Sequence, residues 1–201
     1  MSRLDVVAGP NGGGKTTFVA QVLAAITPSS VFVNADDIAK ERWPADPSAH
    51  AYQAAAAAAD TRAYLLGLRR PFIAETVFSH RSKVDLIRDA QAAGYRVVMH
   101  VLLVPEDLAV KRVRYRVEAG GHDVPEDKIR QRYRRLWDLV AEGIVESDSA
   151  LIYNNAGEGP RIVATVVAGQ TIGCPTWPTW TPAVLSSSLH REQSPDRGPR
   201  A

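Results

Sequence analysis

The strongest chemical signal in the sequence is the segment from Gly9 to Thr16. It reads GPNGGGKT and matches G-x-x-x-x-G-K-[ST] without a mismatch, between an expected strand and an expected helix. Glycines there let backbone N–H groups converge on phosphate oxygens, and the following helix directs its partial positive end at the same anion. Lys15 is expected to reach the β- and γ-phosphates, and the Thr16 hydroxyl to ligate Mg²⁺.

The expected cofactors are therefore a nucleoside triphosphate, taken as ATP, and magnesium. The residues expected to bind the nucleotide are Gly9, Pro10, Asn11, Gly12, Gly13, Gly14, Lys15, Thr16 and Thr17.

A phosphate loop alone does not distinguish a kinase from a GTPase or a transporter ATPase. The sequence contains no N-K-x-D motif of GTPases and no L-S-G-G-Q-like signature of ABC ATPases, for which Gly120-Gly121-His122 is no substitute. These exclusions favour a small-molecule kinase. Such an enzyme needs a base near the acceptor hydroxyl and cations around the phosphoryl group.

Carboxylates follow two expected strands. Asp36 and Asp37 come just after one, and Glu75 with Thr76 closes the next, so these side chains should enter the ligand crevice at the carboxyl edge of the sheet. Asp36 can accept the acceptor's hydroxyl proton; capping of the next helix by Asp36 or Asp37 is the alternative. Glu75 can hold a water on Mg²⁺ or a substrate hydroxyl, and a solvated strand-end acid is its alternative.

Arginines cluster around a glycine pair. Arg112 and Arg116 lie four residues apart, hence on one helical face, and Arg130, Arg132, Arg134 and Arg135 follow the segment 120–125. Such a group can form a lid that closes on phosphates and neutralises developing charge. A solvated basic face is the alternative, which we expect to hold for Arg134 and Arg135.

The elements that must position these residues alternate along the chain. Short apolar runs indicate strands, and segments with helical periodicity separate most of them. We expect strands over 4–8, 31–33, 71–76, 95–104, 150–153 and 161–168, and helices over 16–25, 48–68, 82–93, 105–119 and from 125 onward. This order predicts an α/β fold: a three-layer P-loop NTPase sandwich with a parallel sheet covered by helices on both faces.

Composition sets the broad class. The chain has 201 residues, a net charge of +2, 45% hydrophobic and 23% charged residues, all typical of a globular protein. The near-neutral balance argues against nucleic-acid binding, and no apolar run is long enough to span a membrane. A lone Cys174 and the lack of an apolar leader favour a cytoplasmic location.

Domain organisation changes near residue 171. We expect a kinase domain over 1–170 and, because prolines recur without periodicity, a flexible tail over 171–201. Trp177 and Trp180 do not suit a disordered tail, and docking on the domain or on a partner is the alternative.

Five segments together resemble the zeta toxin family of P-loop kinases: GPNGGGKTT, NADDIA, AETVFSH, RVEAGGHDVP and IRQRY. The resemblance covers about residues 3–155 and points to the short stand-alone branch of the family. It implies an adenylate-kinase-like core and phosphorylation of a nucleotide sugar such as UDP-N-acetylglucosamine.

By resemblance, Lys15, Asp36, Arg116 and Arg132 are the expected catalytic residues. Asp36, Glu75, Thr76 and His122 are the expected acceptor-binding residues, and Thr16 the magnesium ligand. The chain departs from the short branch at Asn154-Asn155-Ala156, where Asp-Asn-Ser is usual, which weakens the expected nucleotide contact of that loop. The rival function is an ATP-binding module whose nucleotide state is linked to a partner such as an antitoxin.

Overall fold

The computed structural model describes residues 2–119 and 124–189. They form a seven-stranded sheet in the order β2-β3-β1-β4-β5-β6-β7. The strands are β1 (Arg3–Ala8), β2 (Val31–Val33), β3 (Phe72–Thr76), β4 (Arg96–Leu103), β5 (Ser149–Asn154), β6 (Arg161–Val167) and β7 (Gln170–Ile172). The helices are α1 (Lys15–Phe18), the π-helical η1 (Val19–Leu23), α2 (Ala24–Ile26), α3 (Ala35–Arg42), α4 (Ala51–Gly67), α5 (Ser82–Ala92), α6 (Glu106–Glu118), α7 (Glu126–Glu146) and α8 (Ala183–Ser188).

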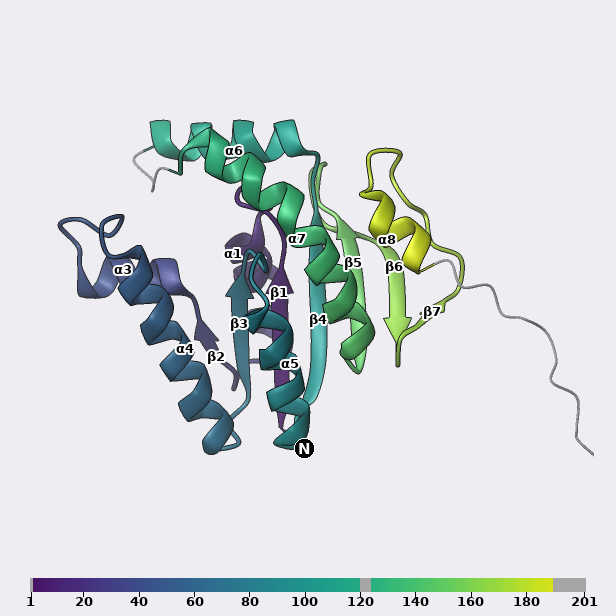
Figure 1. The fold of residues 1–201 in the computed structure, drawn as a ribbon, viewed down its shortest axis with the longest axis horizontal. Helices are drawn as coiled ribbons and strands as arrows, with labels where there is room; N and C mark the ends of the chain where they lie inside the picture. Colours follow the sequence, from purple (N-terminus) through teal and green to yellow (C-terminus); the bar gives the residue numbers. More distant parts are fainter. Residues whose placement is uncertain (1, 120–123, 190–201) are drawn as a thin grey trace, which may run out of the picture.

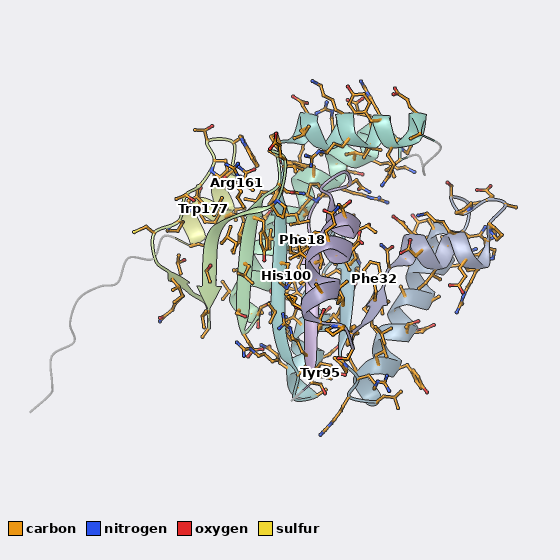
Figure 2. All side chains as sticks on the ribbon, turned by 180° about the vertical axis from the view of Figure 1, so that it is seen from behind. Phe18, Phe32, Tyr95, His100, Arg161 and Trp177 are labelled. Carbon is orange, nitrogen blue, oxygen red and sulfur yellow. The ribbon has the colours of Figure 1, made fainter. Side chains whose placement is uncertain are left out.

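The predicted three-layer α/β architecture is confirmed. Helices α4, α5 and α7 lie on one face of the sheet and α1 on the other, as Figures 1 and 2 show from opposite sides. Each face has its own apolar cluster, because successive residues of a strand point to opposite faces. Leu4 and Val6 of β1 belong to the larger cluster with α5 and α7, while Val7 belongs to the smaller cluster with Phe18 of α1.

The last strands differ from the expected parallel sheet. Strands β2, β3, β1, β4 and β5 pair in parallel, but β6 pairs antiparallel with β5, and β7 antiparallel with β6. A parallel crossover needs about a dozen residues, usually a helix, whereas only residues 155–160 join β5 to β6. The short connection therefore returns the chain as a hairpin.

The structure also differs from the expected flexible tail over residues 171–189. Strand β7 extends to Ile172, and α8 buries Leu185 completely, with Leu189 only 3% exposed. Trp177 and Trp180 pack against the larger apolar cluster, so the docked alternative describes these two residues. Residues 190–201 of the expected tail lie outside the described residues.

The parallel strands position the site. Strand β1 lies between β3 and β4, and the carboxyl ends of all three meet at one edge of the sheet, across which α6 lies in Figure 1. Helices α6 and α7 contact each other through a third apolar cluster of Val110, Val113, Val124 and Ile129, separate from the two sheet clusters. No helix within the described ranges is long and apolar enough to cross a membrane.

Candidate active site

The phosphate loop connects β1 to α1, as its motif predicts. Gly12 and Gly14 have φ of 72° and 82°, in the left-handed region that favours glycine. A Cβ at Gly12 would lie 2.4 Å from the Ala109 carbonyl oxygen, and one at Gly14 would lie 2.6 Å from Asn155 Nδ2. These positions leave no room for a side chain. Gly12 and Gly14 also line a cavity of about 860 Å³.

Nucleotide-binding candidates in this cavity's wall are Asn11, Gly12, Gly14, Lys15, Thr16 and Thr17, while Gly9, Pro10 and Gly13 complete the loop. Asn11 Oδ1 is buried and has no hydrogen-bond partner in the described part of the chain.

Lys15 lies at the electrostatic centre of the cavity. Its side chain is 7% exposed, and Nζ donates a hydrogen bond to the Pro10 carbonyl oxygen at 2.8 Å. Burial lowers the pKa of Lys15; the carboxylates of Glu75 and Asp36 act against that shift, and the charges of Arg116 and Arg132 add to it. The residues predicted from separate motifs therefore share one electrostatic environment.

Glu75 and Thr16 meet at the edge between β3 and the loop. Thr16 Oγ1 donates to Glu75 Oε2 at 2.9 Å, and Asn34 Nδ2 donates to the same oxygen at 2.8 Å. Burial raises the pKa of Glu75, and the charge of Lys15 opposes that rise. Hydroxyl and carboxylate oxygens side by side are the donors that Mg²⁺ prefers, so this pair fits the expected metal.

No cluster of three or more His, Cys, Asp or Glu side chains suited to a metal occurs in residues 2–119 and 124–189. A magnesium ion held by one or two protein groups plus nucleotide phosphates does not require such a cluster.

Asp36 and Asp37 have different surroundings. The N-cap of α3 is Asn34, whose Oδ1 accepts a hydrogen bond from the Asp36 backbone N–H at 2.7 Å. The capping alternative for Asp36 and Asp37 therefore does not apply, because Asn34 occupies that position. The Asp36 side chain lines the cavity, whereas Asp37 pairs with Lys40 at 3.5 Å.

The segment after β3 has a strained backbone. Phe78 has a φ of 62°, which is unusual for a bulky residue, and its ring is fully buried. Thr76 Oγ1 accepts a hydrogen bond from the Phe78 N–H at 3.0 Å. Thr76, Val77 and Ser79 consequently line the cavity next to Glu75.

The arginines separate into two groups. Arg112, Arg116 and Arg132 line the cavity, and Arg112 Nη1 donates to the Asn155 carbonyl oxygen at 2.9 Å. Arg130 instead pairs with Glu106, Asp107 and Glu126, which ties α6 to α7. Arg134 is 73% exposed, in keeping with the solvated alternative. His122 lies outside the described residues.

Asn155 joins the loop after β5 to the phosphate loop. Its Nδ2 donates to the Gly13 carbonyl oxygen at 2.8 Å, and Asn155 also lines the cavity. The substitution pattern at 154–156 does not reveal this, because the contact joins residues 142 positions apart.

Sequence reasoning also missed Asn34, Arg62 and Lys83. The position of Asn34 two residues before Asp36, at the start of the expected helix, was a usable signal, since asparagine is a preferred N-cap. Arg62, a lone cation in the apolar stretch of α4, was another.

Comparison with solved structures finds the same fold at low identity. The complex of AvrRxo1-ORF1 and AvrRxo1-ORF2 with sulphate ions matches with a TM-score of 0.69 and 16% identity over 98% of this chain and 66% of that chain. The PezAT toxin–antitoxin system of Streptococcus pneumoniae matches with a TM-score of 0.65 and 14% identity over 82% of this chain and 72% of that one. Shikimate kinase from Acinetobacter baumannii matches with a TM-score of 0.52 and 17% identity over 79% of this chain and 86% of that chain.

The chain spans only 60% to 66% of the length of the AvrRxo1-ORF1:ORF2 structures. A search of curated protein sequences finds no significant match. A family model described as an AAA domain matches residues 4–137, which include β1, the phosphate loop, Asp36, Glu75 and Arg132. With its P-loop kinase-like fold, the chain belongs to this AAA-domain family, AAA_33.

Proposed function

We propose that this protein is an ATP- and Mg²⁺-dependent kinase that transfers the γ-phosphoryl group to a hydroxyl of a small molecule. The observation that carries the proposal is the convergence of Lys15, Glu75, Asp36, Arg116 and Arg132 on one cavity. Phosphoryl transfer is catalysed mainly by positioning and electrostatic stabilisation, and these residues supply both. A fold neighbour solved with ATP supports the choice of nucleotide.

Each side chain has a role that its surroundings favour. Lys15 and the loop N–H groups bind phosphate oxygens, and Arg116 and Arg132 neutralise negative charge that develops during transfer. Thr16 and Glu75 would hold Mg²⁺, which when bound neutralises the phosphates. Asp36 accepts the proton that leaves the acceptor hydroxyl, and Thr76 binds the acceptor. His122, which lies outside the described residues, is proposed as an acceptor-binding residue from the family resemblance alone.

The leading acceptor is a nucleotide sugar such as UDP-N-acetylglucosamine, on the strength of the resemblance to the zeta toxin family. A cytoplasmic location suits both substrates. The rival proposal is an ATP-binding module linked to a partner such as an antitoxin. Two fold neighbours support it, because one is described as a complex of two proteins and the other as a toxin–antitoxin system.

Acceptor-dependent ADP release separates the two proposals. A kinase releases ADP only when a suitable acceptor is present, whereas a module does so without one. We therefore expect ATP, Mg²⁺ and a panel of nucleotide sugars to give ADP and a product heavier by one phosphoryl group in mass spectrometry. ADP release that is equal with and without every acceptor would favour the module.

Asp36→Asn tests the proposed base. Because Asn34 is the cap, the substitution should leave melting nearly unchanged and ATP affinity within a few-fold of wild type. Turnover should fall by at least about a hundredfold, since positioned proton transfer contributes about 10²–10⁴-fold. Asp37→Asn is the matched control, because Asp37 pairs with Lys40, and it should reduce turnover much less than Asp36→Asn. Retention of most turnover by Asp36→Asn would shift the base to Glu75.

A further inference from the structure

Arg62 is a largely buried cation for which the described residues supply no hydrogen-bond or ion-pair partner. It lies in the second half of α4 and is 8% exposed, and burial lowers the pKa of its guanidinium. Within residues 2–119 and 124–189, no carboxylate or carbonyl oxygen accepts a hydrogen bond from it. Burial of the side chain disfavours the charged form of Arg62, and no carboxylate among the described residues offsets that penalty. The protein therefore retains a cation at a place where stability alone favours an apolar residue.

Lys83 is a second cation next to Arg62. It lies in the first turn of α5 and is half-buried; burial lowers its pKa, and the positive charge of Arg62 lowers it further. Its Nζ makes one long hydrogen bond, 3.4 Å, to Ser82 Oγ. Two like charges close together destabilise each other's charged form. An anion bound between Arg62 and Lys83 would stabilise both.

The pair lines the same cavity as Lys15 and Asp36 but is not among the charges that act most strongly on Lys15. Arg62 and Lys83 line the cavity together with Ser79, Val77 and the alanines of α4. The charges that act most strongly on Lys15 are those of Glu75, Asp36, Arg116 and Arg132. The nucleotide phosphates thus have their own cations at the loop, and Arg62 and Lys83 are left for a different anion.

We propose that Arg62 and Lys83 form a second anion site, which binds a phosphate or diphosphate group of the acceptor while the acceptor's hydroxyl lies at Asp36. The inference rests on the proposed kinase function and narrows its substrate class to phosphorylated small molecules. A guanidinium and an ammonium carry two positive charges, which a phosphate dianion neutralises. A carboxylate carries one negative charge and would leave one of the two cations without a counter-ion. Neutral sugars and alcohols leave both cations unpaired and are poor acceptors.

A binding experiment tests the site without turnover. The protein is saturated with Mg²⁺ and a non-hydrolysable ATP analogue, which fills the phosphate loop, and inorganic phosphate is then titrated by calorimetry. Arg62→Met and Lys83→Met should each weaken phosphate binding at least about tenfold, as loss of a charge-assisted hydrogen bond predicts. Affinity for the ATP analogue should stay within a few-fold in both variants.

Matched controls use cations away from the cavity. Arg161→Met on β6, which Figure 2 places beside Trp177, and Lys111→Met on the exposed side of α6 should bind phosphate like wild type. Equal phosphate affinity in Arg62→Met, Lys83→Met and these controls would overturn the second site.

Kinetics with paired acceptors then identify the substrate class. For a sugar phosphate and the corresponding free sugar, wild type should strongly prefer the phosphorylated one, and Arg62→Met should raise its KM at least about tenfold and remove most of the preference. Efficient transfer to the neutral sugar, unchanged by Arg62→Met, would overturn the inference and leave the kinase standing. If wild type phosphorylates no acceptor, the proposed function fails, while the phosphate titration still decides the site.

Melting curves separate loss of binding from loss of folding. Without ligand, Arg62→Met should melt at or above the wild-type temperature, because it removes an unpaired buried charge. Arg62→Lys keeps one positive charge and should recover part of the phosphate affinity. A strongly lowered melting temperature in Arg62→Met would mean that Arg62 has a structural role, and would contradict the proposal.

Discussion

At the scale of single residues, the cavity contains charges that the unliganded fold would be more stable without. Lys15 is buried with one backbone carbonyl as its hydrogen-bond partner, and burial raises the pKa of Glu75 beside it. Replacing a buried charge with an apolar side chain of similar volume is often neutral or stabilising. Charges of this kind are retained because a ligand pairs with them.

Lys15→Met should separate stability from binding. We expect its melting temperature to be equal to or above that of wild type, and its affinity for ATP with Mg²⁺ to fall about 10- to 100-fold, because a charged hydrogen bond to the phosphates is lost. Calorimetric titration and a melting curve check both, with Lys111→Met as the control. Equal ATP affinity in wild type and Lys15→Met would contradict the phosphate-loop assignment.

Asp5 differs from Lys15, because its buried charge is paired with other side chains of the protein. Its carboxylate is fully buried, accepts two hydrogen bonds from Arg3 and lies 2.9 Å from His100 Nε2. Burial by itself raises the pKa of Asp5, but the hydrogen bonds and charges of His100 and Arg3 outweigh burial and lower it. Figure 2 shows His100 next to Phe18 of α1, and the centroids of the two rings are 5.5 Å apart.

Asp5→Asn should destabilise the fold by about 3 kcal/mol near neutral pH, the usual cost of breaking a buried charged pair. Because the folded-state pKa of Asp5 is lowered, its stabilising effect is present above the unfolded-state value of about 3.9 and is lost as pH falls through the folded-state pKa. Urea unfolding at several pH values should show a shallower acid decline in Asp5→Asn than in wild type. The exposed Asp60→Asn is the control; identical pH profiles for all three proteins would refute the role of Asp5.

At the scale of elements, α7 contacts the segment after β3, residues 77–81, and also contributes to the cavity wall. Arg132 lines the cavity from the first half of the helix, and Gly143 in the second half lies against the ring of Phe78. A Cβ at Gly143 would approach Phe78 Cζ to 2.8 Å and Met99 Sδ to 3.2 Å. Phe78 in turn fixes the turn that presents Thr76 and Ser79.

Gly143→Ala therefore sets two effects against each other. Alanine favours a helix over glycine by about 1 kcal/mol, but overpacking a full core costs about 1–3 kcal/mol. We expect a net loss of stability and a raised acceptor KM with little change in ATP affinity. Gly67→Ala, at the end of α4 where a Cβ meets nothing within 4 Å, should be neutral or stabilising. A stabilised Gly143→Ala with normal kinetics would contradict the link between α7 and the loop.

At the scale of the whole molecule, the chain beyond β6 completes the core. Helix α8 packs on α7, and Leu185, Leu189 and Trp180 extend the larger apolar cluster. Figure 1 shows α8 beside the antiparallel end of the sheet, away from α3 and α4. This segment therefore contributes to stability and not to the cavity.

Leu185→Ala should lower the free energy of unfolding by about 2–4 kcal/mol, since it empties a fully buried position. ATP affinity of the remaining folded protein should not change. Ser187→Ala, at an exposed position on the same helix, should stay within about 0.5 kcal/mol of wild type. If both variants unfold alike, α8 is not a packed part of the domain.

The sequence alone determined the nucleotide half of the molecule. The phosphate loop is a local structure, because its glycines, Lys15 and Thr16 are consecutive and have β1 before them and α1 after them. The apolar runs of the parallel strands are equally local signals, since burial on both faces requires them. Asp36 and Glu75 were found because any side chain at the carboxyl end of such a strand faces the same edge.

Only the tertiary structure decided the contacts and the burial of residues whose partners lie far away in the sequence. The contact of Asn155 with Gly13, the burial of Arg62 beside Lys83 and the packing of Leu185 join residues far apart in sequence, and no local pattern encodes such pairs. The prolines after residue 171 predicted a flexible tail, but proline content carries no information on burial. Burial is set by which surface the folded domain presents to that segment, so it became visible only when the sheet and α7 were in place.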